Sequence, residues 1–296
     1  MSWYPPQNQP PQQGGYPPQN GYPQPQFTPA PIIKVKEAPL VVSKKAWGIK
    51  EAALSIAAEI LLLLLILPVV EGAINAGNLP LAIYATLIGQ FGGMYAVWMG
   101  FMIYSSYFKG QKSWPRDFGF KFKWYDIFIG LGLGLITLTT QNIIIAGMSI
   151  LNSATATDLV STTPTVLAAT QPAVPYWYSI LFGIILPVLC APFFEELYFR
   201  GFIMGSMIRF FKRFTDTPKL QWMNKFKYLF AATFSSVVFG MIHIQDYHTQ
   251  GDWMTPILTG STGFVLAWAA ILFKRLGPGM MGHATHNAFI TINTMM

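Results

Sequence analysis

The chain has 296 residues, of which 52% are hydrophobic and only 10% are charged, whereas a soluble domain carries about 25% charged residues. This composition excludes an ordinary soluble domain and predicts a membrane protein with several spans. The formal net charge of +7 allows nucleic-acid binding until its distribution is considered, and the single cysteine excludes an intrachain disulfide or a thiolate metal cluster.

The first 31 residues contain no charged residue and consist largely of Pro, Gln, Tyr and Gly. Such a composition cannot bury a core, so it predicts a disordered cytoplasmic tail over residues 1–45. These residues also lack the apolar run of a secretory signal peptide. Two interpretations of the tail stay open, an inert solvating segment and a segment that binds an unknown partner, and the composition favours the first.

Seven apolar runs follow the tail, and a membrane-crossing helix needs about 20 such residues. They predict an all-α transmembrane bundle with spans at 49–70, 80–105, 126–151, 177–200, 228–245, 256–273 and 278–296. We divide them into an N-terminal membrane region of three spans, residues 46–176, and a C-terminal core of four spans, residues 177–296.

The basic residues give these spans an orientation. Of the 19 Lys and Arg, 18 precede the first span, lie at its start or fall in alternate connections, and Arg200 is the last residue of the fourth span; connections 71–79, 152–176 and 246–255 contain none. Because cytoplasmic loops are enriched in Lys and Arg, this pattern predicts a cytoplasmic N-terminus. The positive charge therefore orients the protein in a bilayer, and we expect no nucleic-acid partner.

Several small and polar residues inside the spans predict contacts between helices. Gly130 and Gly134 lack the strand–turn–helix context of a dinucleotide loop, and their four-residue spacing predicts close helix packing. Glu59 must face protein, although the sequence assigns it no role. Three amides are predicted to bond neighbouring helices, Gln90, Gln141 and Asn142.

The fourth predicted span is interrupted by Pro187 and Pro192. Proline removes a backbone donor and should kink or break the helix there. A new helix would then begin at Phe193 and place Glu195 in its first turn, where the helix dipole favours an anion. Cys190, within the same apolar run, is predicted to be a small buried residue.

Two adjacent carboxylates, Glu195 and Glu196, lie inside this run. Charged groups at membrane depth are costly, which makes them functional candidates. On a helix Glu196 and Arg200 share one face and are predicted to pair, whereas Glu195 points about 100° away. We therefore expect a structural Glu196 and a chemical Glu195; the alternative is that both acids neutralise Arg200 near a helix end.

All four histidines follow this stretch. His243 shares a helical face with Phe239, and His283 shares one with Asn287. These polar groups lie on separate spans, and each costs insertion energy, so they are expected to converge. His286 has two open interpretations, an accessory donor and a packing residue.

Such a cluster would serve peptide hydrolysis. A free carboxylate beside an imidazole can deprotonate a water, and a second imidazole with an amide can stabilise the resulting oxyanion. Glu195, His243 and His283 could instead hold zinc. The HExxH, GxSxG and GxGD motifs are all absent.

Three ordered motifs, Glu195-Glu196-x-x-x-Arg200, Phe239-x-x-x-His243 and His283-x-x-x-Asn287, together resemble the signature of the type II CAAX prenyl endopeptidase family. That family is also called the CAAX protease and bacteriocin-processing (CPBP, or Abi) family of intramembrane proteases. The resemblance covers roughly residues 177–296 and implies that they form a CAAX-protease-like catalytic membrane core.

The resemblance also implies a role for each residue. Glu195 would be the catalytic base and His243 would help to hold the water. His283 and Asn287 would stabilise the oxyanion, with Glu196 and Arg200 as supporting or substrate-contacting residues. Although the family is often labelled a metalloprotease family, the resemblance implies a glutamate mechanism without a cofactor, with Zn²⁺ as the alternative.

The expected function is therefore that of a hydrolase, an intramembrane endopeptidase that acts on a membrane-associated protein or peptide. Members from eukaryotes cut lipidated substrates, whereas this chain looks more like a multi-pass protein of a bacterial plasma membrane. A non-catalytic immunity or scaffold protein of the same family is the alternative. A carrier is disfavoured because no internal repeat is evident.

Overall fold

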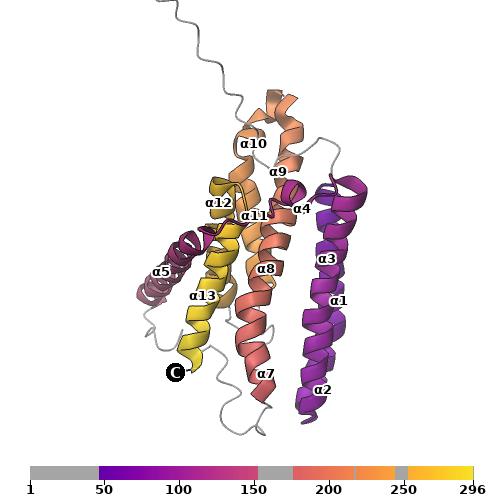
Figure 1. Cartoon of the computed structure of the whole chain (residues 1–296), viewed down its shortest axis with the longest axis vertical. Helices are drawn as coiled ribbons and strands as arrows, with labels where there is room; N and C mark the ends of the chain where they lie inside the picture. Colours follow the sequence, from indigo (N-terminus) through magenta and orange to yellow (C-terminus); the bar gives the residue numbers. More distant parts are fainter. Residues whose placement is uncertain (1–46, 153–175, 217, 244–252, 296) are drawn as a thin grey trace, which may run out of the picture. The chain divides into compact units, whose positions relative to one another are not determined.

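The computed structural model describes residues 47–152, 176–216, 218–243 and 253–295 (Figure 1). Every regular element in these ranges is a helix, which confirms the all-α class. The predicted tail lies outside them, as do most of the predicted connections 152–176 and 246–255. The division into a tail, an N-terminal region and a C-terminal core stays a prediction.

The N-terminal region contains two long helices that pack against each other. The first is α1 (Ile49–Asn75), and the second is made of α2 (Leu79–Tyr84), η1 (Ala85–Gly93), α3 (Met94–Tyr104) and η2 (Ser105–Lys109). Helix α1 packs on α2, η1 and α3, and these elements lie side by side in Figure 1. Short α4 (Trp114–Asp117) leads to α5 (Asp126–Asn152).

The C-terminal region is organised around one continuous helix of 37 residues, Tyr176–Lys212. It consists of α7 (Tyr176–Ile180), η4 (Leu181–Cys190), α8 (Ala191–Glu195), η5 (Glu196–Ile203) and α9 (Met204–Lys212). The remaining elements are η6 (Arg213–Asp216), η7 (Pro218–Leu220), α10 (Gln221–Lys225), α11 (Lys227–Met241), α12 (Met254–Phe273) and α13 (Gly277–Met295).

In the described part of the chain, five helices are long and apolar enough to cross a membrane, fewer than the seven expected. They are Ile49–Asn75, Leu79–Lys109, Asp126–Ile150, Tyr176–Lys212 and Met254–Phe273. Helix α11 has 15 residues, which extend only about 22 Å. Helix α13 carries His, Asn and Thr, which lower its hydropathy. The count of seven and the cytoplasmic N-terminus stay predictions.

Pro187 and Pro192 do not break the central helix, so the prediction of a new helix at Phe193 is wrong. The turns around Pro187 widen to a π-helical spacing, in which a donor bonds the carbonyl five residues earlier. The Ala191 N–H bonds the Leu186 carbonyl in this way. Glu195 therefore lies within a continuous helix, where the favourable dipole of a first turn is absent. Cys190 is also half-exposed rather than buried.

Aromatic side chains join the two regions. The ring of Trp98 on α3 stacks on Tyr198 with centroids 4.5 Å apart, and its indole Nε1 donates a 3.0 Å hydrogen bond to Glu59 Oε2. Glu59 is only 1% exposed, which confirms that it faces protein. Trp47 stacks on Phe202 with centroids 4.8 Å apart. The central helix is thus buried against α1 and α3 as well as against its own region.

Helix α5 approaches α13 closely at two glycines, as their spacing predicts. A methyl group added to Gly130 would collide with Met281 and the backbone of Gly282, and one added to Gly134 would lie 2.6 Å from Thr285 Cγ2. This contact fixes the position of α13, which carries two of the histidines.

The three amides predicted to join helices have different outcomes. Gln141 Nε2 donates to the Leu258 carbonyl at 3.2 Å and to Thr262 Oγ1 at 3.0 Å, which confirms its prediction. Asn142 is exposed and no described residue bonds it, so its prediction is wrong. Asn142 is the residue after Gln141 on α5, so its side chain lies on the exposed face of that helix. The side chain of Gln90 lies outside what the structure describes.

Replacing Gly130 with Ala is expected to destabilise the protein by about 1–3 kcal/mol, because the added methyl group overpacks the α5–α13 contact. Gly132 is the matched control on the same helix, since a methyl group there meets no atom within 4 Å. Thermal unfolding in detergent should show a lower midpoint for Gly130→Ala only. Equal midpoints for the two variants would contradict the close approach.

Candidate active site

A cavity of about 700 Å³ lies among α1, η1, α3, α5, η4, α8, α11, α12 and α13. Its wall combines apolar side chains with most of the polar residues that the sequence singled out. The polar residues on the wall include Gln141, Glu195, His243, His283, His286 and Asn287. These residues come from three separate helices, α5, α8 and α13, and from the end of α11, and they meet at one place, as the cost of polar groups in a membrane predicts.

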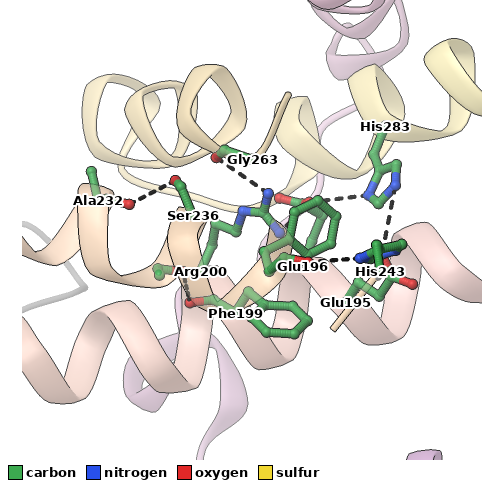
Figure 2. A network of polar contacts seen from close by, with 11 residues as sticks. Glu195, Glu196, Phe199, Arg200, Ala232, Ser236, His243, Gly263 and His283 are labelled. Atoms are coloured by element: carbon green, nitrogen blue, oxygen red, sulfur yellow. Dashed lines mark hydrogen bonds and ion pairs between the residues drawn. The ribbon is translucent and has the colours of Figure 1, made fainter. Parts of the chain in front are cut away.

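Glu196 and Arg200 lie behind this wall and form a fully buried ion pair. Arg200 Nη1 is 3.1 Å from Glu196 Oε1, and both side chains are 0% exposed. Arg200 Nη2 also donates to the Gly263 carbonyl at 3.2 Å, as Figure 2 shows. The guanidinium lies 4.3 Å from the centre of the Phe239 ring. The predicted pairing is thus present, and the bond from Arg200 to Gly263 ties the central helix to α12.

His283 lies between the two carboxylates. Its Nδ1 is 3.2 Å from Glu196 Oε1, and its Nε2 is 3.7 Å from Glu195 Oε2 (Figure 2). The first distance is a hydrogen bond, in which the ring N–H donates to Glu196. The second is too long for a direct hydrogen bond. Glu196 thus fixes the ring of His283 so that Nε2 faces Glu195 and the cavity.

Glu195 keeps a free oxygen. The residue is 6% exposed, and its Oε2 has no hydrogen-bond partner in the described part of the chain. An unsatisfied buried carboxylate oxygen is costly, so it calls for an explanation. Glu196 is thus paired with Arg200, as the sequence predicts, whereas Glu195 has only the longer contact with His283.

His243 reaches the cavity from the C-terminal end of α11. Its Nδ1 donates to the Phe239 carbonyl at 2.7 Å, which leaves Nε2 available to the cavity. The Phe239 ring contacts both imidazoles, with centroids 4.7 Å from His243 and 5.8 Å from His283. The sequence predicts only that Phe239 and His243 share one face of a helix. The contacts of Phe239 with His283 and Arg200 depend on how the helices pack.

Asn287 has a structural bond that the sequence did not predict. Its Nδ2 donates to the Pro187 carbonyl at 2.7 Å. In the π-helical spacing that carbonyl would accept from residue 192, which is a proline without an N–H. Asn287 therefore supplies the missing donor, and its second amide N–H remains for another acceptor.

The zinc alternative depends on Glu195, His243 and His283. Within the described ranges, no group of three His, Cys, Asp or Glu side chains is arranged as a metal site. Nδ1 of His283 is bonded to Glu196 and Nδ1 of His243 to a backbone carbonyl, as in histidines that bind a metal through Nε2. Nε2 of both rings and Oε2 of Glu195 are the atoms that would hold Zn²⁺, and the metal alternative stays a prediction.

Residues 177–289 match the family model described as Type II CAAX prenyl endopeptidase Rce1-like. The match supports membership of this part of the chain in that family. The match contains all six predicted site residues, from Glu195 to Asn287. No curated protein and no solved structure matches the chain.

Membership in the Rce1-like family places the C-terminal region among the proteases. Together with the long apolar helices, the match supports a membrane-embedded protein of the hydrolase class. Helices α1, α3 and α5 lie outside the matched residues, yet each contributes to the wall of the cavity. The Rce1-like core is therefore completed by the N-terminal region.

Proposed function

We propose that this protein is an intramembrane endopeptidase in which Glu195 activates water to hydrolyse a peptide bond. The observation that carries the proposal is the unbonded Oε2 of Glu195, buried at the cavity wall 3.7 Å from His283 Nε2. Two groups at this separation can both contact one water molecule. A carboxylate in that position can take the proton of the water as a general base.

The reaction would proceed by direct attack. Glu195 takes one proton from the water, and the oxygen forms a bond to the scissile carbonyl carbon, whose own oxygen becomes the oxyanion. His243 helps to hold the water. When the intermediate collapses, the C–N bond breaks and Glu195 returns the proton to the leaving amine, so no covalent enzyme intermediate is needed.

His283 and Asn287 are proposed to stabilise the oxyanion. His283, with Nδ1 bonded to Glu196, donates from Nε2 as an imidazolium, whose charge Glu196 offsets. Asn287 donates with the amide N–H that the Pro187 carbonyl leaves free. Glu196 and Arg200 are supporting residues, because they hold the ring of His283 in position without lining the cavity.

The setting of the cavity supports a proposal for the substrate class. Apolar side chains such as Leu63, Leu67 and Phe182 share its wall with the catalytic groups. They would accept an apolar part of a membrane-associated protein or peptide, including a lipid group if the substrate carries one. We propose the plasma membrane of a bacterium as the location.

The experiment that tests this function is cleavage of a quenched fluorescent peptide library by the purified protein in liposomes. Wild-type protein is expected to cleave at least one peptide. If wild type and Glu195→Gln are both silent, the proposal fails and the non-catalytic immunity or scaffold alternative remains.

Metal removal is expected to leave cleavage intact. Glu195, rather than a metal ion, activates the water in the proposed mechanism, so a strong zinc chelator should not change kcat/KM. The control is a zinc-dependent protease treated in parallel, which the chelator should inactivate. Loss of cleavage with chelator and its recovery on adding zinc would contradict the metal-free mechanism.

A further inference from the structure

Helix α5 carries a stripe of four residues on the face that meets α12 and α13. The residues are Gly130, Gly134, Thr137 and Gln141, and their spacing of four, three and four keeps them on one side of the helix. The two glycines allow α13 to come close, and the two polar residues then bond across the contact. Their arrangement suggests that α5 positions something on α13.

Thr137 bonds the ring of His286. The hydroxyl of Thr137 donates its one hydrogen to the Gly134 carbonyl at 2.7 Å. Its 3.0 Å contact with Nδ1 of His286 must therefore be donated by the ring. This fixes the neutral tautomer with the proton on Nδ1, and Nε2 is left as a hydrogen-bond acceptor.

His286 presents this acceptor to the active-site cavity. The residue is 6% exposed and lies on the cavity wall with Glu195 and His283. No residue that the structure describes bonds Nε2. The proposed mechanism assigns no role to Nε2 of His286. An acceptor held in one tautomer by two neighbouring residues, and open only to the cavity, is suited to a ligand that donates a hydrogen bond.

We propose that His286 is a substrate-binding residue, which accepts through Nε2 a hydrogen bond from a backbone N–H of the bound peptide. This inference rests on the proposed function. A peptide that enters the cavity loses water from its N–H groups, and an unbonded N–H there is costly. In the proposed mechanism both ring nitrogens of His283 donate, so that ring offers no acceptor to a peptide N–H. His286 supplies a neutral acceptor without adding charge.

The tautomer can be measured without any turnover. NMR of ¹⁵N-histidine-labelled protein distinguishes protonated from unprotonated ring nitrogens, and only four histidines contribute. His286→Asn assigns the signal. We expect the Nδ1–H form in wild type and its loss in Thr137→Val, which removes the hydroxyl at nearly constant volume. Thr139→Val is the matched control, because Thr139 is exposed and bonds only the Leu135 carbonyl of its own helix.

The substrate role is tested with the best-cleaved peptide of the library. His286→Asn keeps a donor toward Thr137 but has no atom at the Nε2 position. KM should therefore rise roughly 3–10-fold, which corresponds to the loss of one neutral hydrogen bond, and kcat should change less. His286→Gln places an amide near the Nε2 position and should recover part of this loss. Thr137→Val should raise KM, and Thr139→Val should leave it unchanged.

Each outcome separates the inference from the proposed function. An Nε2–H tautomer in wild type, or a tautomer that Thr137→Val leaves unchanged, would overturn the positioning by Thr137. Normal KM values for His286→Asn in an active protein would overturn substrate binding by His286 and leave the endopeptidase standing. A correct tautomer with no cleavage by wild type would contradict the proposed function and the substrate role together.

Discussion

Glu195→Gln is expected to lower kcat by about 10²–10⁴-fold while the protein stays folded, because the carboxamide cannot take a proton from water. Glutamine has nearly the same shape as glutamate. In addition, Oε2 of Glu195 makes no hydrogen bond within the described residues that the substitution could break. The effect should therefore fall on the chemical step and leave the thermal midpoint close to that of wild type.

The matched control for this variant is Glu71→Gln on α1, since Glu71 is exposed and does not line the cavity. Cleavage rates and thermal midpoints of the three proteins are compared in the same detergent. A Glu195→Gln protein that cleaves at the wild-type rate would remove Glu195 from the role of base. A variant that is inactive and also unfolded would instead assign it a structural role.

Arg200→Met is expected to destabilise the protein by about 3–5 kcal/mol, because it removes the guanidinium from the buried Glu196 carboxylate and leaves it only the ring of His283. Glu196 and Arg200 are both 0% exposed, so water cannot replace the lost interaction. The substitution also removes the donor to the Gly263 carbonyl and the cation above the Phe239 ring. Unfolding by denaturant or heat measures the loss.

A double variant separates the charge from the packing. Adding Glu196→Gln to Arg200→Met removes both buried charges, and much of the stability should return, since well-packed neutral replacements of buried ion pairs are often tolerated. Arg116→Met serves as the control, because Arg116 is exposed. If Arg200→Met unfolds at the same midpoint as wild type, the ion pair does not support the fold.

Local features of the site could be predicted from the sequence because they depend on helical spacing alone. Glu196 and Arg200 are four residues apart, and the pair forms as expected. Gly130 and Gly134 show where helices approach, although the spacing could not identify α13 as the partner. The helical class and the membrane setting followed from composition.

The helix break was mispredicted because a proline was treated without its tertiary partners. A proline in water leaves a carbonyl unbonded, which usually ends a helix. Here the turns widen around Pro187, and the side chain of Asn287 donates to the Pro187 carbonyl across 100 residues of sequence. The central helix therefore continues, and Glu195 does not gain the dipole of a helix start.

The contacts that define the site join residues too far apart for any periodic pattern to show. His283 bonds Glu196 over 87 residues, and Thr137 bonds His286 over 149. The sequence could predict that these polar groups converge, because isolated polar groups in a membrane are costly. It could not predict which nitrogen would face which carboxylate, since that depends on the packing of α5, α13 and the central helix.

The central claim is tested most directly by mass spectrometry of peptide products formed in H₂¹⁸O under single-turnover conditions. The account predicts new carboxyl termini that each carry one ¹⁸O atom with wild-type protein, unlabelled Glu195 in that protein, and no new termini with Glu195→Gln. No cleavage by wild type, or ¹⁸O found in the Glu195 side chain, would contradict hydrolysis by a water that Glu195 activates.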